Sequence, residues 1–128
     1  MQDVNRFVIR QKLWLIGRLG KVRARILFDT GANVSLIRDD LARKIEDVDE
    51  LLGRAHRCYS ATGSFMVRPG MIADVEISRY PLMANLCVAK ELTEDVILGD
   101  DFMGRWGLML DPKHRRVMVE PEYLRLQA

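Results

Sequence analysis

The sequence predicts a mainly β domain with one or two short helices, and three observations support this fold class. Apolar and polar residues alternate at a period of two in several short stretches, as they do in half-buried strands. Turns rich in glycine, proline or charge separate these stretches. Only one longer stretch has the three- and four-residue spacing of an amphipathic helix. Because the chain has 128 residues, we expect a single domain over 1–128 with its core in 13–119.

The first two strands are predicted on either side of a glycine-containing turn. Residues 7–19 mix apolar and basic side chains, and Gly17 and Gly20 permit a turn into the next strand. From Val22 to Phe28 every second side chain is apolar, and two of the three side chains between them are arginines. We therefore expect a hairpin whose second strand is half buried.

A helix is predicted from residue 39 or 40 to residue 52. Apolar residues recur there every three or four positions with charged residues between them, namely Leu41, Ile45, Val48, Leu51 and Leu52. Asp39 or Asp40 is suited to cap the start of this helix, and Gly53 is suited to end it.

Two hairpins and a short helix are predicted in the second half of the chain. Residues 71–78 and 82–88 alternate around a turn at Arg79-Tyr80-Pro81. Residues 108–110 and 117–119 flank a charged, proline-containing turn, which favours a last pair of strands. A short helix is expected near 102–106.

Composition and charge exclude several classes of function. Hydrophobic residues make up 48% of the chain, which argues against intrinsic disorder, and a net charge of only +2 does not describe a nucleic-acid binder. The basic run 113–116 is short and lacks interleaved aromatic residues, so it is interpreted as a solvated turn. No apolar stretch approaches the ~18 residues of a membrane span.

The remaining signals predict a cytoplasmic protein without a metal or other cofactor. The N-terminus lacks the basic start and apolar run of a signal peptide. Cys58 and Cys87 form no Cys-x-x-Cys pair, and the chain has only two histidines, which argues against a structural zinc site. A disulfide between the two cysteines is one alternative, but two free thiols in a reducing compartment are the simpler interpretation.

The chemistry of the sequence is concentrated where an apolar strand runs into Asp29-Thr30-Gly31. A carboxylate at the end of a buried strand is unfavourable unless it is hydrogen-bonded or needed for chemistry. Gly31 permits a tight turn that points backbone N–H groups back at Asp29, and Thr30 adds a hydroxyl. Alone, such a tripeptide is more often an ordinary turn than an active site.

The order of the motifs around this tripeptide resembles that of the retropepsin-like (retroviral-type) aspartic proteases. Asp29-Thr30-Gly31-Ala32 looks like the catalytic loop, the hairpin around 61–64 like the flap, and Ile97-Leu98-Gly99 like the segment that supports the loop. The run Leu98 to Phe102 is closest to the cellular Ddi1-type protease domains. The resemblance implies a closed β-barrel of the acid-protease fold with one lobe per chain.

This resemblance also assigns expected roles to individual residues. Asp29, Thr30 and Gly31 are implied to be catalytic, and Ile97, Leu98 and Gly99 to support them. The implied substrate-binding residues are Ala32, Tyr59, Ser60, Ala61, Thr62, Gly63, Ser64 and Ile97. Two departures from the viral pattern are visible: Asp100-Asp101 stands where many viral members have Arg-Asn, so a bracing arginine is missing, and Gly63 is the only glycine near the flap tip.

Peptide hydrolysis by this route requires two carboxylates that share one proton. The chain has a single Asp-Thr-Gly and is too short for two lobes, so we expect a homodimer in which two Asp29 residues meet on the axis. In the family, the residue corresponding to Thr30 hydrogen-bonds across that axis. The tail 120–128, with Tyr123, Leu124 and Leu126, is a candidate dimer contact, although an edge strand or frayed end fits it equally.

The expected function is an aspartic endopeptidase that acts on peptide or protein substrates. Asp100 or Asp101 is an alternative second carboxylate within one chain, but Asp101 is better suited to cap the helix that follows it. A catalytically inactive dimeric module for peptide binding or assembly is the alternative function, because a fold does not fix an activity.

Overall fold

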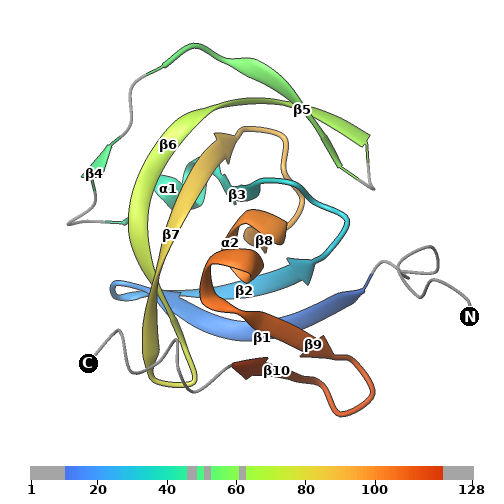
Figure 1. Cartoon of the computed structure of the whole chain (residues 1–128). Coiled ribbons are helices and arrows are strands. Elements are labelled where there is room, and N and C mark those ends of the chain that lie inside the picture. Colours follow the sequence, from blue (N-terminus) through green and yellow to red (C-terminus); the bar gives the residue numbers. More distant parts are fainter. Residues whose placement is uncertain (1–10, 46–48, 51–52, 61–62, 120–128) are drawn as a thin grey trace, which may run out of the picture.

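The computed structural model describes residues 11–45, 49–50, 53–60 and 63–119. Twelve elements follow one another along these residues (Figure 1). They are β1 (Lys12–Leu19), β2 (Val22–Asp29), β3 (Ser35–Arg38), α1 (Asp39–Ala42), β4 (Asp49–Glu50), β5 (His56–Ser60), β6 (Gly63–Ile77), β7 (Tyr80–Ala89), β8 (Val96–Leu98), α2 (Asp100–Trp106), β9 (Leu108–Asp111) and β10 (Arg116–Val119).

The strands form a closed barrel, which confirms the predicted fold class. Its order is β1-β2-β8-β3-β7-β6, and β6 pairs back with β1 to close the sheet. Strand β7 pairs with β6 from Val67 to Ile77, while β5, β4 and β1 pair with successive parts of β6. Closure satisfies backbone hydrogen bonds that an open sheet edge would leave unpaired.

The first hairpin is confirmed, but only one of its two glycines makes the turn. Leu19 pairs with Val22, so Gly20 and Lys21 form the turn, and Gly20 has a φ of 61°. Gly17 instead lies within β1, where a Cβ would come within 2.8 Å of the carbonyl oxygen of Glu76. Gly17 therefore permits the close approach of β6 to β1.

Alternating side chains of β2 enter two apolar clusters. Ile26 and Phe28 are fully buried in the larger cluster, which also receives side chains from β6, β7, β8 and α2. Leu27 points the other way, into a second apolar cluster defined by Leu27, Ala32, Leu36, Val67, Ala89, Leu92 and Ile97. Burying each such large side chain contributes about 1.5–3 kcal/mol, so β2 is fixed from both faces.

The helix predicted over 39–52 is wrong beyond its first turn. Only α1 is helical, its N-cap is Arg38 without a side-chain cap bond, and Asp49 and Glu50 form β4 by pairing with β6. Residues 46–48 and 51–52 lie outside the described part of the chain. Gly53 ends no helix; it packs against the ring of Pro69, where a Cβ would collide. Backbone pairing with β6 outweighs the helical spacing of apolar residues.

The later elements agree with the predictions apart from one shifted turn. The β6–β7 turn lies at Ser78 and Arg79, whose φ angles are 48° and 75°, and Tyr80 and Pro81 already belong to β7. The short helix α2 and the β9–β10 pair are confirmed. This pair forms a separate two-stranded sheet beside α2 (Figure 1).

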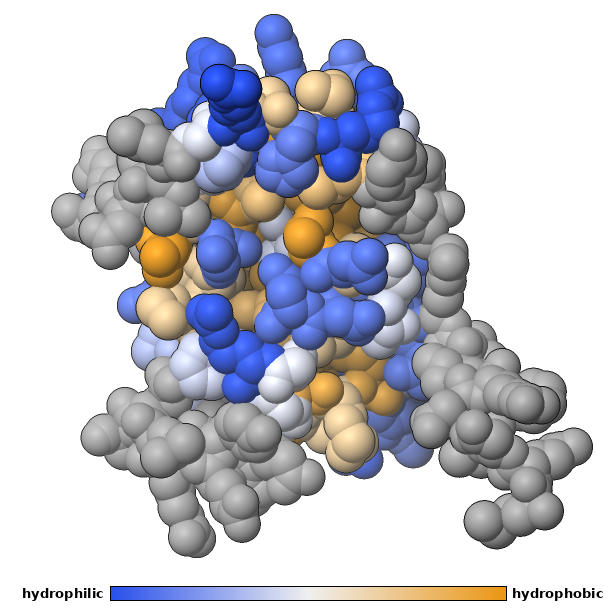
Figure 2. Space-filling view, turned by 45° about the horizontal axis from the view of Figure 1, so that its top comes forward, coloured by the Kyte–Doolittle hydropathy of each residue, from blue (hydrophilic) through white to orange (hydrophobic). Residues whose placement is uncertain are grey.

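The surface is mixed in character. On the face in Figure 2, apolar side chains are visible between groups of hydrophilic ones. None of the described helices has the length and apolar character needed to cross a membrane.

Candidate active site

Asp29 is the last residue of β2, and only 1% of it is exposed. Its carboxylate oxygen Oδ1 accepts a hydrogen bond of 2.8 Å from the Gly31 N–H, and its backbone carbonyl accepts one of 3.1 Å from Ala32. The turn expected at Gly31 is therefore present. Among the described residues no basic side chain forms an ion pair with Asp29, so the backbone of its own loop holds the carboxylate.

The loop after Asp29 rests on the end of β8. Strands β2 and β8 run parallel, with Phe28 paired to Leu98, so both end at the same level. The Asp100 N–H donates a 2.8 Å hydrogen bond to the carbonyl of Ala32. A Cβ on Gly99 would lie 2.9 Å from the carbonyl oxygen of Val34, so this position needs glycine. Leu98 and Gly99 thus lie directly beneath the loop, and their supporting role stays a prediction.

A serine and an aspartate tie the end of this loop to α2, in the region where the viral arginine is missing. Ser35 is 1% exposed; its hydroxyl donates to Asp101 Oδ1 at 2.7 Å and accepts from the Gly99 N–H at 3.0 Å. The Ser35 N–H donates to Asp101 Oδ2 at 3.2 Å, and the Phe102 N–H donates to Oδ1 at 2.8 Å. The carboxylate of Asp101 therefore joins β3 to α2.

This arrangement corrects the role expected for Asp101. The N-cap of α2 is Gly99, which has no side chain, and Asp101 lies inside the helix. Sequence reasoning missed Ser35 altogether. The available signal was a hydroxyl residue within the apolar run from Val34 to Ile37, where a buried polar group requires partners.

Asp100 is not paired with Asp29 within one chain. The structure records no hydrogen bond between the two side chains, and Asp100 is exposed. Partial desolvation, followed by the nearby charges of Asp101 and Asp29, raises the pKa of the Asp100 carboxyl above its usual range. The alternative in which Asp100 is the second carboxylate therefore finds no support in the hydrogen bonds of the described residues.

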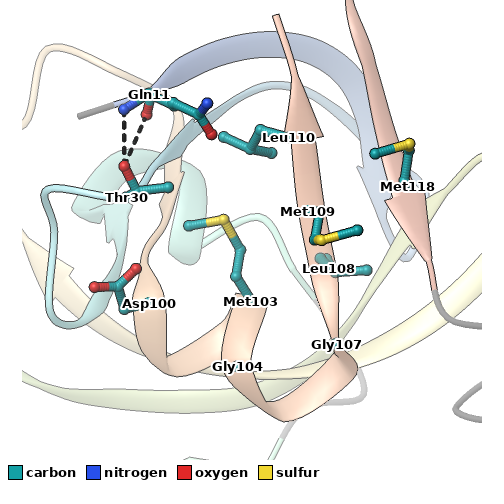
Figure 3. A pocket seen from close by; sticks show the side chains of 10 residues that line it. All are labelled: Gln11, Thr30, Asp100, Met103, Gly104, Gly107, Leu108, Met109, Leu110 and Met118. Atoms are coloured by element: carbon teal, nitrogen blue, oxygen red, sulfur yellow. Dashed lines mark hydrogen bonds between the residues drawn. The ribbon is translucent and has the colours of Figure 1, made fainter. Parts of the chain in front are cut away.

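Thr30 lies beside Asp29 and is held by the backbone of Gln11. The Gln11 N–H donates to Thr30 Oγ1 at 2.8 Å (Figure 3), and the Thr30 N–H donates to the Gln11 carbonyl at 3.1 Å. The hydroxyl also approaches that carbonyl at 3.4 Å. Thr30 therefore extends the β1–β2 ladder by one pair.

A groove of about 840 Å³ opens next to Thr30; we call it the Thr30 groove. It runs between the Gln11–Thr30 pair, α2 and the β9–β10 pair, and Met103 projects into it (Figure 3). Met109 is 55% exposed, and Met118 is its cross-strand partner. The lining residues are Gln11, Thr30, Asp100, Met103, Gly104, Gly107, Leu108, Met109, Leu110 and Met118.

The hairpin expected around 61–64 is formed by β5 and β6. Ser60 pairs with Gly63, and Ala61 and Thr62 between them lie outside the described residues. Val67 is the first residue of β6 that pairs with β7, so the preceding part of β6 pairs with β5 alone. The hairpin therefore projects beyond the barrel (Figure 1). Pairing also places the backbones of Tyr59 and Ser64 opposite each other.

The second apolar cluster joins the Asp29 loop to the base of this hairpin. Ala32 and Ile97, two expected substrate-binding residues, belong to it, together with Val67 of β6. Cys58 of β5 and Cys87 of β7 are partly buried against it, and burial raises the pKa of both thiols. Within the described ranges, no three His, Cys, Asp or Glu side chains are grouped closely enough to hold a metal ion.

A sequence model of the family described as gag-polyprotein putative aspartyl protease matches residues 17–105. The chain belongs to this family. The match to the aspartyl protease family includes the Asp29 loop, the β5–β6 hairpin and most of α2, and it ends before β9.

Solved structures share the fold of this aspartyl protease family member. The retroviral protease-like domain of Ddi1 from Leishmania major is 19% identical, with 86% of this chain and 89% of that chain covered and a TM-score of 0.66. EIAV protease, solved in complex with the inhibitor HBY-793, is 17% identical, with 79% and 93% covered and a TM-score of 0.60. The expected retropepsin-like fold is therefore confirmed.

Proposed function

We propose that this chain is an aspartic endopeptidase whose active form is a two-fold homodimer. The observation that carries the proposal is the buried carboxylate of Asp29, held by the Gly31 N–H at the end of β2. A purely structural turn does not need a buried carboxylate, because burial disfavours its charged form. Membership of the aspartyl protease family supports the same role.

The second carboxylate is proposed to be Asp29 of a second copy. Two carboxylates close together share one proton, so the pair titrates as a unit. The ionised member accepts a proton from water as the water oxygen attacks the peptide carbonyl carbon, and the protonated member donates to the carbonyl oxygen. The C–N bond then breaks as the amide nitrogen takes a proton. We expect activity to be greatest at acidic to mildly acidic pH.

The Thr30 groove is the proposed contact between the copies. It begins at Thr30, next to Asp29, and its walls carry exposed or partly exposed methionines that a second copy would cover. Closed two-fold symmetry presents the same groove on both copies, so a single patch serves both sides. Residues 120–128, including Tyr123, Leu124 and Leu126, lie outside the described chain, and their role in the dimer remains a prediction.

The substrate is proposed to be an extended peptide lying between the Asp29 loop and the β5–β6 hairpin. Extended peptides pair with strand backbones, while alternate side chains enter pockets. The second apolar cluster lies beneath this space; Ala32 is 2% and Ile97 3% exposed, so they form its floor more than its walls. The flap role of residues 59–64 belongs to the same proposal.

The test combines solution mass with cleavage of a peptide pool. Wild type is expected to dimerise and to cleave, and Asp29→Asn should lower turnover by roughly 10²–10⁴-fold without unfolding, since it removes the proton-transfer group. Asp74→Asn is the matched control, because Asp74 is exposed on β6 away from the loop. Cleavage by Asp29→Asn at the wild-type rate would refute the proposal, and a monomer without cleavage at any pH would favour an inactive binding module.

A further inference from the structure

A second hollow, of about 320 Å³, lies at the base of the β5–β6 hairpin. We call it the basic hollow because three cationic side chains and one carboxylate line it. It shares only Val67 with the second apolar cluster and no residue with the Thr30 groove. Its lining residues are Asp39, Arg43, Ala55, Met66, Val67, Arg68, Val88 and Lys90.

The single carboxylate of the basic hollow, that of Asp39, already pairs with two arginines. Asp39 Oδ2 accepts from Arg43 at 2.9 Å and Oδ1 accepts from Arg68 at 3.0 Å. Burial alone would raise the pKa of Asp39, but the hydrogen bonds from Arg68 and Arg43 outweigh it and hold that pKa below its usual range. Asp39 therefore stays ionised and balances only part of the positive charge around it.

The cationic side chains retain donors for a further anion. An arginine has five N–H donors in a planar fork, and Arg43 and Arg68 each use one nitrogen on Asp39 while remaining more than half exposed. Lys90 is exposed and makes no ion pair with any described residue. A carboxylate entering the hollow would meet three cations.

The remaining lining is apolar, which restricts the class of ligand. Val67 and Val88 are buried, and Met66, a flexible apolar side chain, is 53% exposed. Nucleic acids are bound by cations interleaved with aromatic stacking surfaces, and the lining of the hollow has no aromatic residue. A ligand that presents carboxylates next to apolar side chains fits this lining better than a nucleic acid does. A peptide that contains both acidic and apolar residues is such a ligand.

The basic hollow also lies where the β5–β6 hairpin leaves the barrel. Val67 pairs with His56 of β5 and with Ala89 of β7, so it marks the point where the hairpin leaves the barrel. Arg68 follows immediately, and its bond to Asp39 ties β6 to α1. A ligand here would contact α1, β6 and the residue after β7 together.

We propose that the basic hollow binds an acidic peptide segment with interspersed apolar residues, at a site separate from the Asp29 cleft. On the proposed protease, such a segment would be a stretch of the protein substrate outside the cleaved region. Binding at the hollow does not depend on cleavage or on the dimer, so the two proposals can fail independently.

The test measures fluorescence anisotropy of a fluorescein-labelled octapeptide, Asp-Glu-Leu-Asp-Glu-Leu-Asp-Glu, with the full-length Asp29→Asn chain, which prevents cleavage. We expect Lys90→Gln and Arg43→Gln each to raise the Kd about three- to tenfold, because each removes one charge-assisted contact. Lys113→Gln is the matched control: it removes the same charge from the exposed β9–β10 turn and should leave the Kd within twofold. The Lys90 variant leaves the Asp39 pairs intact, so its folding is not in question.

Three results would overturn the proposal. The first is equal weakening by Lys113→Gln, which would indicate attraction by overall charge alone. The second is equal affinity for the uncharged octapeptide Asn-Gln-Leu-Asn-Gln-Leu-Asn-Gln. The third is tighter binding of a labelled octadeoxythymidylate that the two hollow variants weaken, which would assign the hollow to nucleic acid.

Discussion

At the scale of single residues, the Asp29 loop is organised by short-range backbone chemistry and one long-range side-chain contact. The Gly31 N–H is two residues from Asp29, so the tripeptide itself supplies the partner that a buried carboxylate needs. Ser35 and Asp101 are 66 positions apart and fix the loop to α2. Asp101 directly follows Asp100, the position at which many viral members have an arginine.

Replacing Ser35 by alanine should destabilise the fold by about 1–3 kcal/mol, because it leaves the Gly99 N–H without its partner and removes one donor from Asp101. Urea unfolding measures this loss. Ser35→Thr, which keeps the hydroxyl, should recover part of the loss, and Ser64→Ala on the exposed hairpin should change stability by no more than about 0.5 kcal/mol. Wild-type stability in Ser35→Ala would show that the contact is dispensable.

The raised pKa of Asp100 predicts a pH-dependent stability difference. A carboxyl with a higher pKa in the folded than in the unfolded chain binds its proton more tightly when folded, so its ionised form lowers stability above that pKa. Asp100→Asn should therefore be more stable than wild type at neutral pH. The difference should shrink as pH falls to about 3, where the wild-type carboxyl is protonated in both states.

Urea unfolding across this pH range, with Asp74→Asn as the control, measures the effect of Asp100. A stability difference that stays constant with pH would assign it to packing instead of charge.

At the scale of elements, the β6–β7 turn contains backbone strain that a substitution can relieve. Ser78 and Arg79 both have positive φ, and two-residue hairpin turns of that shape favour Asn-Gly. A left-handed conformation costs a residue with a side chain about 1 kcal/mol. The double variant Ser78→Asn, Arg79→Gly should therefore raise the free energy of unfolding by about 0.5–1 kcal/mol.

Thermal unfolding measures this gain as a higher Tm. The single variant Arg79→Ala retains the positive φ and is expected to give no comparable gain. A lower Tm in the double variant would mean that the side chains of Ser78 and Arg79 contribute more than the turn geometry.

At the scale of the whole molecule, the proposed homodimer assigns the Thr30 groove to the contact between two copies. A single chain brings one Asp29 to the loop and leaves Met109 exposed beside it. Covering this groove with a second copy would bury the methionines and bring a second Asp29 close to the first. Stability and activity are then linked to protein concentration.

Charge in the Thr30 groove should weaken this association. Met109→Lys is expected to raise the dimer Kd at least tenfold, because a lysine would be buried without a partner, while the monomer stays folded since Met109 is exposed there. Sedimentation velocity over a concentration series measures the Kd. Met83→Lys, on an exposed methionine of β7, is the matched control. Unchanged association in Met109→Lys would place the interface elsewhere.

Local sequence patterns predicted most of the strands and short helices, because the formation of these elements depends mainly on neighbouring residues. Alternation of side chains determines which faces of β2 are buried, and a short helix such as α2, which ends at Gly107 with a φ of 62°, depends on neighbours within a few residues. The 39–52 segment shows the limit. Its spacing fits a helix, but Asp49 and Glu50 pair with β6 more than 20 residues further along the chain, and no local pattern encodes that partner.

The sequence by itself determined the β-rich character of the chain and the turn at Gly31 that satisfies Asp29, because these depend on side-chain alternation and backbone geometry. The closed barrel and the supporting Gly99 were implied by the resemblance to the retropepsin-like proteases. Only the tertiary structure decided that Ser35 and Asp101 fix the loop, that residues 49–50 form a strand and that the Thr30 groove and the basic hollow exist. Those features arise from contacts between residues distant in the chain. Such contacts require the closed barrel, which brings their elements together in space.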